Sequence, residues 1–184
     1  MMENTGFLIT EEDIKRRIKE LAKSIEDDFK DTVPIVIGVL KGSFIFMADL
    51  IRELSINVEV DFLAVSSYGK STKTSGIVKI VKDLSVSIEG RDILLVEDIC
   101  DSGLTLKYLV DLLKGRKPRS LKVCVLLDKK ERRQVNIELD YVGFEVPDKF
   151  LIGYGLDFAE KYRNLPYIRE IREEELREVM GNEG

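Results

Sequence analysis

Acidic and small residues are concentrated in one stretch, residues 94–105, which reads LLVEDICDSGLT. Its apolar start predicts a buried strand, and the adjacent carboxylates Glu97 and Asp98 follow. A turn of small residues at the start of a helix directs backbone N–H groups and the positive end of the helix dipole at an anion. Residues 102–105, SGLT, form such a turn and add two hydroxyl groups, so they suit a phosphate monoester. The carboxylates, Asp101 included, suit sugar hydroxyls or a magnesium ion better than the phosphate itself.

The same spacing also fits a plain acidic loop in which a serine or an aspartate caps a helix. No Gly-Lys-Ser/Thr sequence follows, so the stretch is not a Walker phosphate loop, and the Gly-x-Gly-x-x-Gly pattern of dinucleotide-binding folds is missing. Spacing alone therefore leaves both the phosphate site and the plain acidic loop open.

The composition removes several classes of chemistry. The 184 residues contain 29 basic and 34 acidic side chains, a formal net charge of −5, and no histidine. The lack of histidine excludes Ser-His-Asp triads, histidine proton shuttles and histidine metal sites. The negative net charge offers no electrostatic footprint for a nucleic acid. A bound metal would be a hard ion held by carboxylates, and Mg²⁺ is the default candidate.

The sequence also bears on location. No apolar run approaches the ~20 residues that span a bilayer, and the N-terminus, MMENTGFLIT, lacks a basic-then-apolar signal region. We therefore expect a cytoplasmic protein with no membrane partner. Cys100 and Cys124 are expected to be reduced thiols, because two cysteines cannot build a disulfide scaffold.

Apolar periodicity predicts an alternation of strands and helices. Short aliphatic runs such as VPIVIGVL predict buried strands, and apolar residues spaced three and four apart predict helices. One helix begins after Thr10, which forms a capping pattern with Asp13. The other expected helices are 43–54, 104–114 and the tail segment EEELREVM. The expected strands are 33–40, 58–66, 77–83, 91–97, 121–127, 139–144 and 150–154, with a surface loop at 67–75.

This alternation is typical of the α/β class. We expect residues 1–184 to form a single domain, built on a mostly parallel sheet with helices on both faces. Ligands bind such sheets at the carboxyl ends of the strands. The stretch 94–105 follows such a strand end, where a binding site is expected.

A hydrophobic strand, two acidic residues, then Asp-Ser-Gly and a threonine resemble the phosphoribosyl-diphosphate (PRPP) motif of type I phosphoribosyltransferases. With four further motifs between about residues 7 and 170, the chain resembles the bacterial 6-oxopurine type, the hypoxanthine-guanine phosphoribosyltransferases. The resemblance implies that Glu97 and Asp98 bind the ribose hydroxyls and help to hold Mg²⁺. It implies that Asp101 is the general base or proton partner of purine N7. The residues implied to bind the 5′-phosphate are Ser102, Gly103, Leu104 and Thr105.

A second motif, VLKGSFIF at residues 39–46, resembles the family's pyrophosphate loop. The resemblance implies that Leu40, Lys41 and Gly42 bind the pyrophosphate group, and that the Leu-Lys peptide bond is cis. Taken by itself, the segment is also a plain Lys-Gly turn at a strand end, followed by a serine helix cap.

A third motif, SSYG at residues 66–69, resembles the start of the family's flexible lid. The implied lid spans about residues 66–76, in which Ser67 and Tyr68 close over PRPP and keep water from the reactive sugar carbon. An ordinary hairpin loop has a similar composition.

LLDKKERR, residues 126–133, resembles the segment that supplies the purine-reading lysine, which falls at Lys129. A lysine that donates a hydrogen bond to the exocyclic 6-oxygen favours a 6-oxopurine and rejects the amino group of adenine. Most basic runs of this kind are solvated surface turns, so the flanking motifs carry the assignment.

The longest match is residues 143–168, GFEVPDKFLIGYGLDFAEKYRNLPYI. It implies that Phe150 stacks on the purine and that Leu151 reads the purine edge through its backbone. It also implies that Asp157 binds a second Mg²⁺ and that Arg163 reaches the pyrophosphate. Core packing would explain Phe150 and a loop cap would explain Asp157 without any ligand.

Together the motifs imply purine salvage, in which the 5-phosphoribosyl group of PRPP is transferred to N9 of hypoxanthine or guanine to give IMP or GMP and pyrophosphate. They also imply a purine hood from about residues 1–10 and 143–184, and a homodimer or homotetramer. A transferase that prefers xanthine or another base stays open, as does a PRPP-sensing regulator on the same fold, although the charge of −5 disfavours a regulator that binds nucleic acid. A response-regulator receiver is excluded, because the acidic pair precedes a phosphate-type turn and no phosphoacceptor aspartate pattern lies near the first strand.

Overall fold

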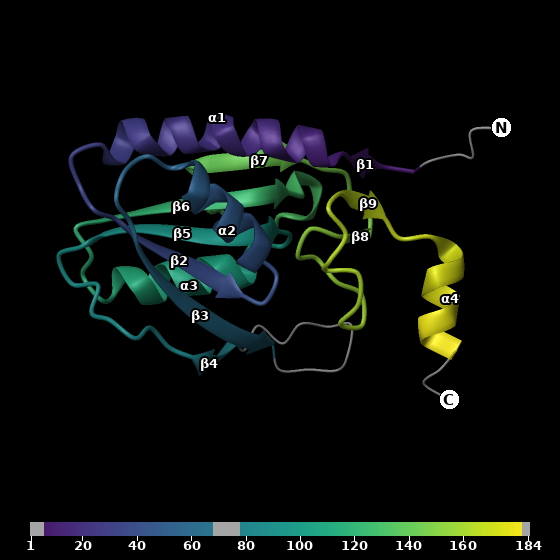
Figure 1. Ribbon diagram of the computed structural model, residues 1–184. Helices are drawn as coiled ribbons and strands as arrows, with labels where there is room; N and C mark the ends of the chain where they lie inside the picture. The colour runs from purple at the N-terminus through teal and green to yellow at the C-terminus, as the bar shows by residue number, and fades with distance from the viewer. Residues whose placement is uncertain (1–5, 68–77, 182–184) are drawn as a thin grey trace.

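Figure 1 shows the computed structural model, which describes residues 6–67 and 78–181. Six strands form the central sheet in the order β4-β3-β2-β5-β6-β7. Neighbouring strands are parallel except β3 and β4, which run antiparallel. The predicted α/β fold with a mostly parallel sheet is therefore confirmed. The strands are β2 (Ile35–Leu40), β3 (Glu59–Ser67), β4 (Val78–Lys82), β5 (Asp92–Cys100), β6 (Ser120–Asp128) and β7 (Tyr141–Glu145).

Helices cover both faces of this sheet, with α1 and α2 over one face and α3 over the other (Figure 1). The core is divided in the same way into two apolar clusters, one that includes α1 and α2 and one that includes α3. Because β2, β5 and β6 are covered on both sides, their apolar runs are nearly continuous rather than alternating. The helices are α1 (Glu11–Phe29), α2 (Phe44–Glu53) and α3 (Leu104–Lys114).

The start of α1 is where the capping pattern predicts it. Thr10 Oγ1 accepts a hydrogen bond of 3.1 Å from Asp13 N, an N–H group that has no partner within the helix. Arg17 donates hydrogen bonds of 2.8 Å to the carbonyl oxygens of Val142 and Gly143, which fastens the helix to β7. The predicted apolar face of the helix is buried: Ile14, Ile18, Leu21, Ala22 and Ile25.

One strand boundary differs from the prediction, and it lies in the candidate site. The strand expected at 91–97 continues as β5 through Cys100, so Glu97 and Asp98 belong to the strand and not to the loop after it. The neighbouring strand β6 reaches Asp128 and offers β5 a pairing partner as far as Cys100. A prediction from hydropathy ends this strand too early. The side chains become polar at Glu97, but the backbone pairing continues to Cys100.

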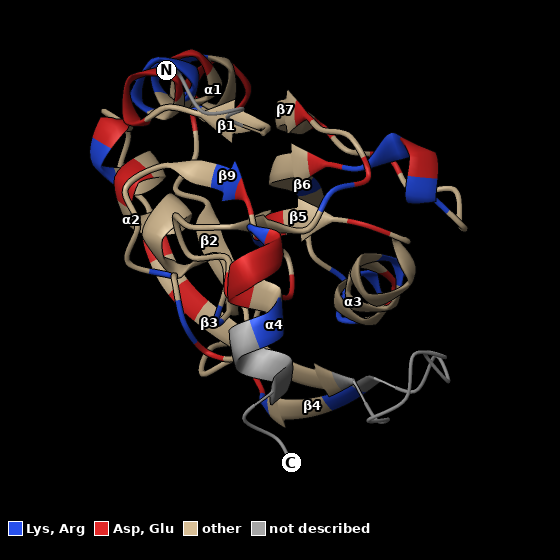
Figure 2. Ribbon diagram, turned by 90° about the vertical axis from the view of Figure 1, so that its right-hand side faces the viewer, with Lys and Arg blue, Asp and Glu red and all other residues tan. Residues whose placement is uncertain are grey.

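A second sheet, antiparallel and three-stranded, lies beyond the carboxyl ends of the central strands (Figures 1 and 2). Its order is β1-β9-β8, so it joins the N-terminal segment to the C-terminal part of the chain. The sequence predicts only β8, as part of 150–154, because strands of two or three residues carry no readable period. β8 stops at Ile152, since Gly153 and Tyr154 have φ angles of 100° and 50°. The strands are β1 (Leu8–Ile9), β8 (Leu151–Ile152) and β9 (Ile168–Glu170).

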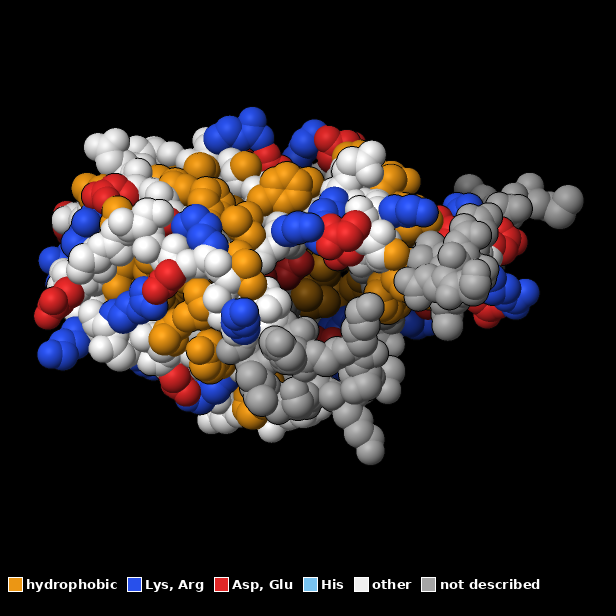
Figure 3. Space-filling model, turned by 90° about the horizontal axis from the view of Figure 1, so that it is seen from below, with side chains coloured by type: hydrophobic (Ala, Val, Ile, Leu, Met, Phe, Trp, Pro, Cys, Tyr) orange, Lys and Arg blue, Asp and Glu red, His pale blue; other side chains and the backbone are white. Residues whose placement is uncertain are grey.

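The chain continues into α4 (Glu173–Gly181), the predicted tail helix, which extends away from both sheets (Figure 1). Arg169 in β9 anchors its first turn through two contacts with the Glu175 carboxylate, of 2.8 and 2.6 Å. Seen from below, the surface mixes both signs of charge with apolar patches and is hollowed near its centre (Figure 3). Over the ranges that the structure describes, no helix is long and apolar enough to cross a membrane.

Candidate active site

The predicted site residues come together at the carboxyl ends of β2, β5 and β6, the edge that faces the viewer in Figure 2. Lys41 follows β2 directly, and the acid pair lies within the last four residues of β5. Lys129 follows β6, and its backbone N–H donates a hydrogen bond of 2.9 Å to the carbonyl oxygen of Cys100. The parallel register of the three strands thus places three separated motifs side by side.

Two glycines let three segments of the site touch one another. A Cβ at Gly42 would fall 1.7 Å from Asp98 Oδ2, and a Cβ at Gly155 would fall 2.2 Å from the carbonyl oxygen of Gly42. Gly155 also has a φ angle of 98°, which an L side chain rarely adopts. The loop after β2 therefore lies in contact with the acid pair on one side and with the loop after β8 on the other. As the resemblance implies, the Leu40–Lys41 peptide bond in this loop is cis.

Within the acid pair, Glu97 is buried and Asp98 is half-buried. Glu97 Oε1 accepts a hydrogen bond of 3.1 Å from Asp98 N, and Asp98 Oδ1 accepts one of 2.7 Å from Ile99 N. Burial, and then the neighbouring Asp98 charge, raises the pKa of Glu97 well above its usual range. Burial also raises the pKa of Asp98, although the positive charge of Arg163 acts in the opposite direction. Removal from water disfavours the ionised form of these two adjacent carboxylates. A cation bound beside them would stabilise that ionised form.

Asp101 stands just past the end of β5. Its Oδ1 atom is buried and accepts no hydrogen bond from the described residues, and it lies 3.2 Å from Arg132 Nε. Arg132 also reaches Asp148 Oδ1 at 3.5 Å. The sequence did not point to Arg132 or Asp148 as site residues. The sequence does hold one signal for Arg132, which is its position three residues after Lys129. The short 3₁₀ turn Lys130–Arg132 places both side chains near Asp148.

Lys129 is buried, with 6% of its surface exposed, whereas the neighbouring lysine in the same basic run points to solvent. Its Nζ atom lies 3.8 Å from Asp148 Oδ1. A buried ammonium with one distant counter-charge has donors to spare for a ligand. The structure thus separates Lys129 from an ordinary surface turn, which the sequence alone could not do.

The turn at 102–105 begins α3. Gly103 is the N-cap residue with a φ angle of 82°, and Leu104 N lies 3.4 Å from Ser102 Oγ. A Cβ at Gly103 would fall 2.9 Å from Arg133 Cδ, so the Arg133 side chain supports the turn from behind. The Arg133 guanidinium is itself held by the carboxylate of buried Asp128. The turn is therefore a rigid helix N-terminus of the type that binds phosphate.

Two basic and two acidic side chains form a cluster where the loop after β2 approaches the loop after β8. They are Lys41, Arg163, Asp157 and Glu160. Arg163 Nη1 donates a hydrogen bond of 2.7 Å to the carbonyl oxygen of Gly155, and its Nη2 lies 3.0 Å from Asp157 Oδ1. Glu160 Oε2 lies 2.9 Å from Lys41 Nζ and 3.4 Å from Arg163 Nη2. Lys41, Asp157 and Arg163 were expected here, and Glu160 was not.

The two residues expected to contact the purine lie at the second sheet, Phe150 directly before β8 and Leu151 within it. Phe150 is 50% exposed and meets Phe158 edge-on, with ring centroids 5.2 Å apart at an interplanar angle of 83°. The neighbouring Leu151 is buried in β8 and pairs with Glu170 of β9. A half-exposed aromatic ring that packs against a second ring can stack on a planar ligand.

The expected lid is only partly placed. Ser67 is the last residue of β3, and Tyr68 lies outside the described residues with the rest of the segment to residue 76.

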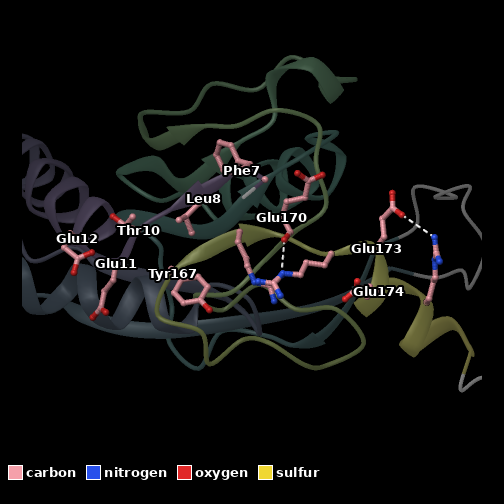
Figure 4. A pocket seen from close by; sticks show the side chains of 13 residues that line it. Phe7, Leu8, Thr10, Glu11, Glu12, Tyr167, Glu170, Glu173 and Glu174 are labelled. Atoms are coloured by element: carbon pink, nitrogen blue, oxygen red, sulfur yellow. Dashed lines mark hydrogen bonds and ion pairs between the residues drawn. The ribbon is translucent and has the colours of Figure 1, made fainter. Parts of the chain in front are cut away.

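A groove of about 1010 Å³ lies between the second sheet and α4 (Figure 4). Its lining includes Tyr167, Glu170 and Arg172, which belong to the segment expected to form the purine hood, and Glu170 pairs with Leu151. None of the individually predicted site residues lines it. The position of the candidate site therefore follows from the convergence of the strand ends, not from the size of a cavity.

Comparison with known families matches residues 9–159 to the phosphoribosyl transferase domain. The chain belongs to this family of phosphoribosyltransferases. The match covers the loop after β2, the acid pair, the phosphate turn and Lys129, and it ends before Arg163.

Within this family, the chain is similar to proteins named hypoxanthine-guanine phosphoribosyltransferase. The hypoxanthine-guanine phosphoribosyltransferase of Bacillus subtilis is 58% identical over 161 residues, 88% of this chain and 89% of that protein. The enzyme of the same name from Aquifex aeolicus is 60% identical over 163 residues, 88% of this chain and 92% of that protein. Among solved structures, the Bacillus anthracis hypoxanthine-guanine phosphoribosyltransferase with a HEPES molecule in its active site is 52% identical. It has a TM-score of 0.87 and covers 94% of this chain and 100% of that one.

Proposed function

We propose that this chain is a hypoxanthine-guanine phosphoribosyltransferase of purine salvage. It transfers the 5-phosphoribosyl group of PRPP to N9 of hypoxanthine or guanine and releases IMP or GMP and pyrophosphate. The observation that carries this proposal is the meeting of four motifs at one sheet edge, in a chain that is 58% and 60% identical to two enzymes of that name. These motifs are the turn at 102–105, the acid pair Glu97 and Asp98, the Lys-Gly loop after β2 and the buried Lys129 after β6.

The sugar phosphate lies across the end of β5. The N-terminus of α3 binds the 5′-phosphate through the backbone N–H groups of residues 103–105, with the Ser102 and Thr105 hydroxyls as further donors. Glu97 and Asp98 accept hydrogen bonds from the ribose hydroxyls. Their carboxylates lie too near the loop after β2 to face the 5′-phosphate, since Asp98 touches Gly42.

The acid pair also fits a divalent cation. The described residues contain no group of three or more carboxylate or thiol side chains that could hold a metal alone. Mg²⁺ commonly uses one or two protein carboxylates and takes its other ligands from water and substrate phosphates. We propose Glu97 and Asp98 as the protein carboxylates of one such ion and Asp157 as that of a second. When bound, Mg²⁺ would neutralise negative charge on the pyrophosphate group of PRPP.

The purine lies between the second sheet and the end of β6. The half-exposed Phe150 ring stacks on the purine, and the Leu151 backbone lies at the purine edge. The buried Lys129 ammonium donates to the 6-oxygen of hypoxanthine or guanine. Adenine has an amino group at this position and would set a donor against a donor, so the site rejects it.

Transfer requires charge to be stabilised at two places. The bond from the sugar C1 to the pyrophosphate oxygen breaks early, so the sugar becomes cationic while negative charge grows on the leaving group. Lys41 and Arg163 stabilise the leaving group. Asp101 takes or shares the proton at purine N7 while N9 attacks, and its negative charge favours the cationic sugar.

We further propose that the protein acts in the cytoplasm as a homodimer or homotetramer. Exposed apolar side chains on the β3–β4 edge, Val60 at 44% and Val81 at 65%, provide surface that a second copy can cover. A solved Trypanosoma cruzi hypoxanthine phosphoribosyl transferase, described for the role of its C-terminal region in oligomeric state and activity, is 44% identical with a TM-score of 0.91.

The test is an assay of the purified protein with PRPP and MgCl₂ against hypoxanthine, guanine, xanthine, adenine and orotate. The proposal predicts turnover of hypoxanthine and guanine and none of adenine or orotate. Turnover dominated by xanthine would identify a xanthine-preferring relative. Binding of PRPP without turnover of any base would identify a PRPP-sensing regulator.

A further inference from the structure

Glu160 occupies the point at which the two cations of the proposed pyrophosphate site meet. Its Oε2 atom lies 2.9 Å from Lys41 Nζ and 3.4 Å from Arg163 Nη2. Lys41 and Glu160 are separated by 119 positions in the chain. A single carboxylate oxygen therefore engages both side chains that are proposed to bind the leaving group.

The backbone around Glu160 fixes this arrangement. Ala159, Glu160 and Tyr162 have φ angles of 49°, 63° and 74°, a conformation that L residues rarely adopt. Glu160 N donates a hydrogen bond of 2.9 Å to Asp157 Oδ2, and the Phe158–Lys161 bridge closes the turn. This tight turn restricts the backbone at Glu160 and directs its side chain toward Lys41.

The Glu160 carboxylate occupies the position of a bound anion between Lys41 and Arg163. The hydrogen bond from Lys41, and more weakly that from Arg163, lowers the pKa of Glu160, so the side chain is a carboxylate at neutral pH. Arg163 holds two further oxygens, the Gly155 carbonyl and Asp157 Oδ1. Lys41 has the Glu160 carboxylate as its ion-pair partner among the described residues. A pyrophosphate group that binds Lys41 and Arg163 therefore meets the Glu160 carboxylate as a competing anion.

We propose that Glu160 is an internal counter-ion that competes with the pyrophosphate group for Lys41 and Arg163. This inference rests on the proposed function, because it assumes that these two cations bind the leaving group. Glu160 neutralises them when no substrate is present, is displaced when PRPP binds, and returns to them as pyrophosphate leaves. It weakens binding of both anions and favours release of the product.

The expected effect is modest. The side chains of Lys41 and Glu160 are 66% and 65% exposed, and ion pairs between exposed side chains are weak and sensitive to salt. Removing the carboxylate charge also removes its repulsion of the incoming anion. We therefore expect a change of about two- to tenfold in affinity.

The test is calorimetric titration of pyrophosphate, with MgCl₂ present, into the wild-type protein and Glu160→Gln. The proposal predicts a pyrophosphate Kd that is about two- to tenfold lower in Glu160→Gln, and a difference that shrinks as salt is raised. Glu20→Gln is the matched control. It removes one exposed glutamate that is paired with an arginine, on α1 away from the site, and should leave the Kd unchanged. An unchanged or weaker affinity in Glu160→Gln would overturn the proposal.

A double-mutant cycle with Lys41→Gln separates competition from a structural role. If Glu160 acts through Lys41, the gain in affinity from Glu160→Gln shrinks when Lys41 is already replaced. An equal gain in both backgrounds would contradict the proposed contact. A wild-type protein that transfers no phosphoribosyl group and binds no pyrophosphate would overturn the proposed function along with this inference. An active wild type with an unresponsive Glu160→Gln variant would overturn this inference alone.

Discussion

The carboxylate of Asp98 lies against the α-carbon of Gly42, so closely that a methyl group at position 42 would fall 1.7 Å from Asp98 Oδ2. This contact joins the acid pair at the end of β5 to the loop after β2. The proposed ribose and pyrophosphate sites are therefore one packed unit, and a change in either loop moves the other.

Gly42→Ala should damage activity while leaving the fold intact. The added methyl group forces Asp98 or the loop out of place, because a contact of 1.7 Å cannot exist. We expect kcat/KM for PRPP to fall about 100-fold, the scale on which a displacement of about 1 Å acts. Steady-state kinetics measures this, with circular dichroism as the check on folding. Gly90→Ala is the control, since a Cβ there meets nothing within 4 Å and should cost stability but not activity. Normal kinetics in Gly42→Ala would contradict the proposed role of this contact.

Lys129→Gln should weaken the choice between 6-oxopurines and adenine. Loss of a buried charged donor to the 6-oxygen should lower kcat/KM for hypoxanthine about 10- to 100-fold, with a smaller change in KM for PRPP. Lys130→Gln is the matched control, because this neighbouring lysine is exposed and paired with Glu145. Equal losses in the two variants would show that the basic run acts through its overall charge rather than through Lys129.

Glu97→Gln should stabilise the empty protein and impair the enzyme. Burial and the neighbouring Asp98 charge raise the pKa of Glu97, so the folded state disfavours the ionised pair at neutral pH. Removing one charge should raise the free energy of unfolding by about 1 kcal/mol, measured with urea at pH 7. The same change should weaken binding of PRPP in the presence of MgCl₂ at least tenfold. A variant that is less stable than the wild type yet binds PRPP normally would contradict both parts.

Asp92 should contribute stability that is lost in acid. Hydrogen bonds from Arg119 and Ser120 lower its pKa to about 2 from a model-peptide value of 3.8. The folded pKa lies below the unfolded one, so the contribution is present above about pH 4 and disappears as the pH falls toward 2. We expect Asp92→Asn to cost about 1–2 kcal/mol in urea unfolding at pH 7, and the gap from the wild type to narrow as the pH falls from about 4 toward 2. A gap that is independent of pH would show that the charge of Asp92 is not responsible.

The central architecture can be predicted from sequence because it rests on long, covered strands. The aliphatic runs around Ile35–Leu40 and Leu121–Leu127 are buried on both faces, and burial leaves a continuous apolar pattern. The capping pattern of Thr10 and the predicted start of a helix at Leu104 are also found in the structure.

The second sheet and several contacts of the candidate site could not be predicted. They join residues that are far apart in the sequence, and no local sequence pattern indicates such contacts. β1 and β9 have only two and three residues; β1 pairs with β9, and β9 pairs with β8 on its other side. Glu160 meets Lys41 across 119 positions, and Arg132 reaches Asp101 from within a run of charges that resembles an ordinary surface. Burial is what distinguishes Lys129 from Lys130, and burial is decided by the whole fold.

The most direct test of the central claim follows the products of one reaction. The purified protein is incubated with PRPP, hypoxanthine and MgCl₂, and IMP and pyrophosphate are quantified together, in parallel with Asp101→Asn. The account predicts equal amounts of IMP and pyrophosphate, and a kcat about 100- to 10,000-fold lower in the variant while PRPP still binds. Release of pyrophosphate without IMP, or full activity in Asp101→Asn, would contradict the account.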